Sequence, residues 1–169
     1  MMLDISVEAD AEWDSSISWA TLAERAVAAA VAESAFPQLA TSERSVEIAL
    51  RLTGDDTVRS LNAEWRGKDK ATNVLSFPLA EADELGVIGD ANSPELMLGD
   101  IVLAQGVCAT EATEKRVPIA DHAAHLMVHG TLHLLGYDHG DDVTAEAMEA
   151  REVRALARLG IADPYAGDR

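Results

Sequence analysis

The five histidines of the chain all lie between residues 122 and 139, and their spacing restricts the local fold more than any other feature of the sequence. His129 and His133 are four residues apart. On an α-helix this spacing places both imidazoles on one face, about 6 Å apart along the axis. Because histidine pairs at this spacing commonly bind zinc, we predict a helix that presents His129 and His133 as two metal ligands.

A third ligand requires this helix to end. His139 lies six residues after His133 and would point to another side of a continuous helix. Gly136 allows the chain to leave the helix, so that His139 can fold back toward the pair. Three neutral imidazoles hold a tetrahedral zinc ion with one open position, as catalytic zinc sites do. The alternative is three ordinary helix and turn histidines, but the spacing and the glycine favour a metal site.

Two further histidines precede this pair on the same helix. His122 and His125 lie seven and four residues before His129, and either is a conceivable ligand. Because the first turns of this helix are polar, we expect both side chains to be solvated. Position 130 is glycine, where the H-E-x-x-H zinc peptidases carry their general base, and this argues against peptide hydrolysis by that mechanism.

The rest of the chain alternates between strand and helix patterns. Alternating apolar residues predict strands over residues 3–7, 45–52, 72–77 and 98–104. Helical periodicity predicts helices over residues 15–35, 55–65, 105–116, 118–135 and 141–159. Residues 81–94 are acidic and rich in Gly, Asn and Pro, which is typical of a loop.

These elements predict one α+β domain over residues 1–169, with a small sheet of about four strands, four or five helices, and the metal-binding helix near the C-terminal end. The pattern alone leaves open whether the sheet is mixed or antiparallel. Cys108 is the single cysteine, which excludes an internal disulfide framework and fits a reducing compartment. We see neither a signal peptide nor a membrane span, and therefore expect a cytoplasmic protein without membrane contact.

Charge by itself argues against a nucleic-acid partner. Thirty acidic residues against thirteen basic ones give a formal net charge of −17, which repels polyanions at long range. However, four of the thirteen bases fall within residues 59–70, which leaves room for a local basic patch on an acidic body. Arg66, Lys68 and Lys70 lie on a glycine-containing loop, where an arginine fork with nearby lysines suits phosphate. The alternative is a solvated loop with Arg66 paired to a carboxylate.

In these segments the sequence resembles the YbeY endoribonucleases, a family of ribosomal RNA maturation factors. The motif H-G-x-L-H-L-x-G-Y-D-H matches completely at residues 129–139. R-G-K-D-K at residues 66–70 and T-N-V-L-S-F-P at residues 72–78 resemble the second signature of the family. Residues 98–101 and 148–165 also resemble family segments.

The resemblance implies a single α+β domain with a small mixed sheet. It implies one zinc ion held by His129, His133 and His139, and an arginine at position 66 that is important for activity. It further implies a single-strand-specific endoribonuclease that matures the 3′ end of small-subunit ribosomal RNA and acts in ribosome quality control. The implied partners are this RNA and the ribosome or its proteins. From their charge, we assign RNA contacts to Lys68 and Lys70.

Two other functions stay open at this stage. The protein could be a non-enzymatic ribosome assembly factor, with a structural metal and an acidic face for basic ribosomal proteins. It could instead be a zinc hydrolase of a peptide or small ester, against which Gly130 argues. The sequence also leaves open whether a metal-activated water or the ribose 2′-hydroxyl attacks the phosphorus. Three imidazoles accept nickel, cobalt or copper as well as zinc.

Overall fold

The computed structural model of the chain describes residues 3–41, 45–80, 96–138 and 140–166. Its strands are β1 (Leu3–Ala9), β2 (Val46–Thr53), β3 (Val74–Pro78) and β4 (Leu96–Ala104). Its helices are α1 (Trp19–Ala32), α2 (Asp55–Arg66), α4 (Gln105–Lys115), α5 (Ile119–Leu134) and α6 (Asp142–Arg158), with a 3₁₀ turn η1 (Pro37–Ala40) that the sequence did not predict. The predicted α+β class is confirmed, whereas the loop expected at 81–94 lies outside the described residues.

The sheet is mixed, as the resemblance implied. In the order β1-β2-β4-β3, the first three strands are parallel and β3 runs antiparallel to β4 at one edge. Parallel neighbours require crossover connections, and helices supply them here: α1 lies between β1 and β2 in the chain. The short edge strand β3 packs against α5.

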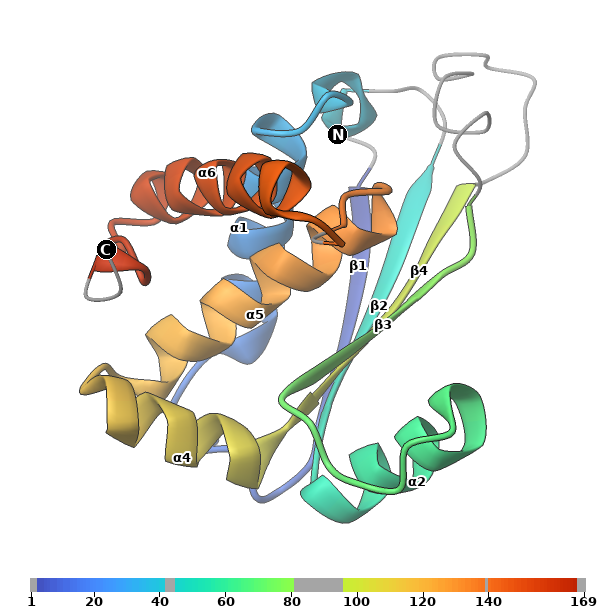
Figure 1. Cartoon of the computed structure of the whole chain (residues 1–169), viewed down its shortest axis with the longest axis vertical. Helices are drawn as coiled ribbons and strands as arrows, with labels where there is room; N and C mark the ends of the chain where they lie inside the picture. The colour runs from blue at the N-terminus through green and yellow to red at the C-terminus, as the bar shows by residue number, and fades with distance from the viewer. Residues whose placement is uncertain (1–2, 42–44, 81–95, 139, 167–169) are drawn as a thin grey trace.

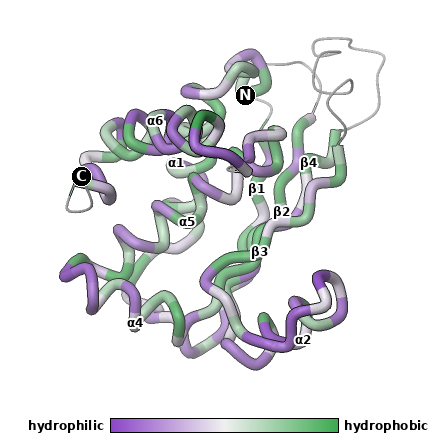
Figure 2. The backbone as a smooth tube through the Cα atoms, viewed as in Figure 1, coloured by the Kyte–Doolittle hydropathy of each residue, from purple (hydrophilic) through white to green (hydrophobic). Residues whose placement is uncertain are grey.

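Helices cover the two faces of the sheet unequally. Figure 1 shows α1, α5 and α6 on one side of the sheet and α2 on the other. Figure 2 shows hydrophobic residues along the strands and a mixture of hydrophobic and hydrophilic residues along the helices. The fully buried core includes Ile48, Leu50, Ile101 and Met127, so it is built mainly between the sheet and the α1–α5 layer.

Gly130 allows α5 to lie very close to the sheet. A Cβ atom added at this position would come within 3.0 Å of the Ile101 side chain of β4. The glycine that argued against a peptidase in the sequence therefore also has a packing role. It brings the C-terminal half of α5, which carries His129 and His133, directly over β4.

The predicted helix ends hold at α5 and α6. Helix α5 begins after Pro118 and ends at Leu134, followed by Gly136 with φ of 96°. Asp141 caps α6, and its side chain accepts a hydrogen bond from the Thr144 backbone N–H in a reciprocal capping box. The first long helix is shorter than the predicted 15–35 and spans Trp19–Ala32. No helix in the described ranges is both long and apolar enough to cross a membrane.

Candidate metal centre

His129 and His133 face each other on α5. Their Nε2 atoms are 3.0 Å apart, and their ring centroids are 4.5 Å apart with an interplanar angle of 81°. The predicted placement on one helical face is therefore confirmed. Both side chains are only half-buried, in contrast to most of the helix around them.

The outer ring nitrogens of this pair contact oxygen acceptors. His133 Nδ1 lies 2.9 Å from the backbone carbonyl oxygen of Tyr137, in the turn that follows α5. His129 Nδ1 lies 2.5 Å from Oε1 of Glu152, which comes from α6. Both contacts place a hydrogen-bond acceptor against Nδ1, on the side of each ring away from the other histidine.

Glu152 is buried with no exposed surface, yet its neighbours favour the charged carboxylate. Burial alone would raise the pKa of its carboxyl group. The nearby His125 ring, 3.6 Å away, and hydrogen bonds with His129 and Tyr165 outweigh burial and lower this pKa to about 2. A carboxylate accepts hydrogen bonds but cannot donate them, so the proton of this contact lies on His129 Nδ1.

The two Nε2 lone pairs therefore converge. A backbone carbonyl likewise only accepts, so the proton of this contact lies on His133 Nδ1, and the neutral ring then directs its Nε2 lone pair at His129. Two lone pairs 3.0 Å apart repel each other unless a cation lies against both. Zinc–nitrogen distances of about 2.0–2.1 Å in a tetrahedral site separate two ligand atoms by roughly 3.4 Å, which is close to this spacing. The donor set thus fits a divalent transition metal.

The third predicted ligand, His139, lies outside the described residues. Among the residues that the structure does describe, no group of three or more His, Cys, Asp or Glu side chains could hold a metal ion. A three-histidine centre therefore stays a prediction that depends on His139. Cys108 is a poor candidate for a metal ligand. It is buried, and burial raises the pKa of its thiol to about 12, which disfavours the thiolate that binds metal.

The basic loop begins where α2 ends. Arg66 is the last residue of α2, and Gly67 ends the helix in the left-handed conformation with φ of 68°. The Arg66 guanidinium lies 5.6 Å from the centroid of the Phe77 ring, and its Nη2 donates a hydrogen bond of 2.6 Å to the Ser76 carbonyl oxygen. The edge strand β3 thus holds Arg66 in place, contrary to the alternative in which a carboxylate pairs with it.

One cavity joins the histidine pair to the basic loop. It has a volume of 520 Å³, and Arg66, Lys68, Lys70, His129 and His133 all line it. These residues come from α2, the loop after it and α5, and the edge strand β3 lies between them. Arg59, the other base of the segment, instead pairs with Asp69 at 2.8 Å and does not line this cavity. Three of the four clustered bases therefore gather beside the histidines.

The expectation that His122 and His125 are solvated is wrong. Their exposed fractions are 4% and 8%. His122 Nε2 donates to Glu111 of α4 at 2.8 Å, and burial, opposed by this carboxylate, lowers the pKa of the His122 ring. His125 Nε2 lies 3.1 Å from the Tyr165 hydroxyl. Helix α4 and the C-terminal segment cover the first turns of α5, and nothing in the local sequence indicates this cover.

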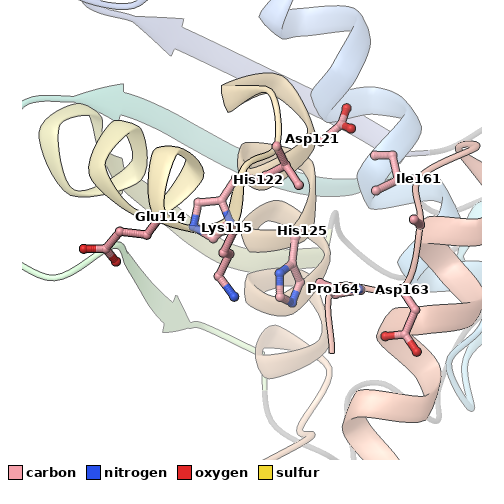
Figure 3. Close-up of a pocket in the computed structure, with 10 residues that line it drawn as sticks. Glu114, Lys115, Asp121, His122, His125, Ile161, Asp163 and Pro164 are labelled. Carbon is pink, nitrogen blue, oxygen red and sulfur yellow. The ribbon is translucent and has the colours of Figure 1, made fainter. Parts of the chain in front are cut away.

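A second cavity lies on the side of this buried pair. It has a volume of 380 Å³ and is lined by His122 and His125 from α5, Glu114 and Lys115 from α4, and the C-terminal segment around Asp163 (Figure 3). Neither His129 nor His133 lines it. His122 and His125 therefore face an acidic hollow that the second pair does not line, although His129 lies beside His125, with ring centroids 6.5 Å apart.

Sequence reasoning missed Glu152 and Tyr165 as members of the site. Glu152 lies 23 residues after His129, and Tyr165 lies 40 residues after His125. These separations are too long for residues on one helix or strand to meet, so no local sequence pattern connects either residue to the histidines. Only the packing of α6 and of the C-terminal segment against α5 brings these side chains together.

The fold and this pocket define an α+β protein with a histidine pair set beside a basic loop. Residues 8–160 match the family model described as Endoribonuclease YbeY. The chain is 54% identical over 165 residues to the endoribonuclease YbeY of Sphingopyxis alaskensis, and the match covers 98% of each chain. It is 50% identical to the endoribonuclease YbeY of Rhizorhabdus wittichii, also over 98% of each chain. The chain belongs to the endoribonuclease YbeY family.

A solved structure has the same fold. The solution structure of TM1509 from Thermotoga maritima matches with a TM-score of 0.59 and 23% identity, over 92% of this chain and 89% of that one. At this identity the match supports the architecture alone.

Proposed function

We propose that this chain, as an endoribonuclease of its family, is a single domain that cleaves single-stranded RNA with the help of one zinc ion. We further propose that it matures the 3′ end of small-subunit ribosomal RNA and acts in ribosome quality control in the cytoplasm, in contact with the ribosome. The observation that carries the assignment to this site is the single 520 Å³ cavity that holds both the histidine pair and the three clustered bases.

The histidines would hold the metal through their Nε2 atoms. His129 and His133 offer converging lone pairs, and His139 is the third proposed ligand. When bound, zinc supplies Lewis-acid chemistry: it polarises a phosphoryl oxygen and lowers the pKa of an attacking group. The chain itself contributes the fixed direction of both lone pairs, because Glu152 and the Tyr137 carbonyl hold the rings from behind.

Arg66 would stabilise negative charge on the phosphate during cleavage. Its guanidinium is already oriented by the Ser76 carbonyl and the Phe77 ring, so little reorganisation is needed when substrate binds. Lys68 and Lys70 line the same cavity and are exposed, which suits contacts to flanking phosphates. These three cations counteract, at the site, the repulsion expected from a net charge of −17.

Cleavage of a single-stranded RNA by protein of known zinc content is the direct test, with His133→Ala prepared in the same way. We expect wild-type activity to scale with zinc and the folded variant to be inactive. Equal activity in both preparations would indicate a contaminating ribonuclease and would favour the assembly factor with a structural metal. Analysis of the product ends then identifies the attacking group, since only attack by the ribose 2′-hydroxyl leaves a 2′,3′-cyclic phosphate.

A further inference from the structure

A buried chain of hydrogen bonds runs from the first metal-site histidine into the body of the protein. Glu152 Oε1 accepts from His129 Nδ1 at 2.5 Å, and Glu152 Oε2 accepts from the Tyr165 hydroxyl at 2.5 Å. The Tyr165 oxygen in turn accepts from His125 Nε2 at 3.1 Å. The two carboxylate oxygens therefore each have their own donor, one on the metal-site side and one on the other.

The donor directions in this chain are mutually consistent. Tyr165 gives its only proton to Glu152, so its oxygen must be the acceptor for His125. Glu152 Oε1 lies 2.5 Å from His129 Nδ1, where a proton on that nitrogen completes the hydrogen bond. The arrangement thus selects one tautomer of His129, with the Nε2 lone pair directed at His133.

From this geometry we propose that Glu152 is a positioning residue for metal binding, which fixes the tautomer and ring orientation of His129, and that Tyr165 holds Glu152 in that role. The inference rests on the zinc part of the proposed function. A carboxylate behind a ligand histidine also makes the ring a stronger donor to the metal. His133 has a neutral backbone carbonyl in the equivalent place, so only His129 receives this support from a charge.

A purely structural role for Glu152 is the competing explanation. The residue joins α6 to α5, and a buried carboxylate with three donors nearby would also tie two helices together. That role predicts a loss of folding stability with unchanged zinc affinity. Positioning predicts a loss of zinc affinity in a protein that is still folded.

The experiment measures the zinc dissociation constant of the full chain by competition with a chromogenic chelator. The variant is Glu152→Gln, which keeps the shape and removes the charge. We expect its zinc dissociation constant to rise about tenfold or more. The matched control is Glu146→Gln, the same change at an exposed position of the same helix, for which we expect no change.

Tyr165→Phe is the second variant. It removes one hydroxyl group and leaves the carboxylate in place, so we expect a smaller increase of the dissociation constant, about two- to fivefold, below the usual effect of losing an outer partner. This variant decides the question if Glu152→Gln does not fold. Thermal unfolding of each metal-free protein establishes that the fold is intact.

Histidine ring nitrogen NMR on the metal-free wild-type protein tests the tautomer without any variant. We expect His129 to carry its proton on Nδ1. A proton on Nε2, or folded variants with wild-type zinc affinity, would overturn the inference while leaving the proposed function intact. A wild-type protein that binds zinc tightly but cleaves no RNA would overturn the proposed function and not this inference.

Discussion

Two histidine pairs lie on the same helix, α5, and differ in burial and in the partners of their Nε2 atoms. His122 and His125 are buried, and partners from α4 and the C-terminal segment take up their Nε2 atoms. His129 and His133 are half-buried, and their Nε2 atoms face each other at the wall of an open cavity. The two pairs differ in which ring nitrogen contacts a group outside α5. In the first pair this nitrogen is Nε2, whereas in the second pair it is Nδ1, so the Nε2 atoms face each other. The first pair contributes to the fold, and we expect the second to contribute to the chemistry.

The strongest test of this comparison is His133→Ala. Because the variant removes one of two converging lone pairs, we expect loss of bound zinc and a fall in RNA cleavage of more than about 100-fold, beyond the effect of losing an outer partner. Zinc content by atomic absorption and cleavage rate measure the two effects. A variant that keeps both would remove His133 from the metal site.

Arg66→Ala should separate charge stabilisation from metal binding. We expect cleavage to fall about 100- to 1000-fold, as for other preorganised donors to developing negative charge, with zinc content unchanged. Arg66→Lys should restore little, since an ammonium lacks the planar fork. Arg25→Ala, an exposed arginine on α1, is the control. Wild-type cleavage by Arg66→Ala would contradict the assigned role.

His122→Ala should show the reverse pattern from His133→Ala. The substitution leaves a cavity in a buried region and removes the hydrogen bond to Glu111, so we expect a stability loss of about 1–3 kcal/mol. Zinc content per folded molecule should stay at the wild-type level. Urea unfolding with metal analysis measures both quantities, and zinc loss without destabilisation would mean that the first pair also binds metal.

Lys68→Ala should produce a smaller effect. In our proposal Lys68 lines the cavity and contacts only phosphates that flank the cleaved bond. The KM for RNA should therefore rise a few-fold, with kcat nearly unchanged. The slope of log affinity against log salt should become shallower by about 0.7, the value for one phosphate contact to a single strand. An unchanged slope would place Lys68 outside the RNA path.

The smallest expected effect lies outside both pairs, at Glu33. Hydrogen bonds from Arg158 and Arg154 hold the pKa of the Glu33 carboxyl below its usual value of 4.5. A carboxyl with a lowered folded pKa contributes stability above pH 4.5 that is lost as the pH falls through the folded value. Glu33→Gln should therefore flatten the acid limb of the unfolding midpoint and leave zinc binding unchanged. An unaltered acid limb would show that these ion pairs add nothing.

The sequence predicted the shared helical face of His129 and His133 correctly and the solvation of His122 and His125 wrongly, for one physical reason. His129 and His133 are four residues apart, and on a helix this spacing alone places both side chains on one face. The burial of His122 depends instead on α4, which the fold brings back against α5. The periodicity of apolar residues along a helix does not indicate which other helix will pack against it.

The same limit explains the basic loop and the missed carboxylate. Arg66 and its neighbouring lysines are visible in the sequence as a cluster of positive charge. Their position beside the histidines, however, depends on the pairing of the edge strand β3 with β4, which the sequence does not show. Glu152 is one of thirty acidic residues, and nothing in its sequence neighbourhood distinguishes it from the exposed ones. Its role is visible only where α6 packs on α5.

The close contact between Gly130 and Ile101 also limits how this scaffold could diverge. Adding a glutamate to the H-x-x-x-H pair would require one substitution at position 130 to make the zinc-peptidase motif. That side chain would begin 3.0 Å from a fully buried isoleucine, facing the sheet. A laboratory selection for proteolysis would therefore have to make room beside Ile101 of β4, so packing as well as one codon separates this chain from the zinc-peptidase motif.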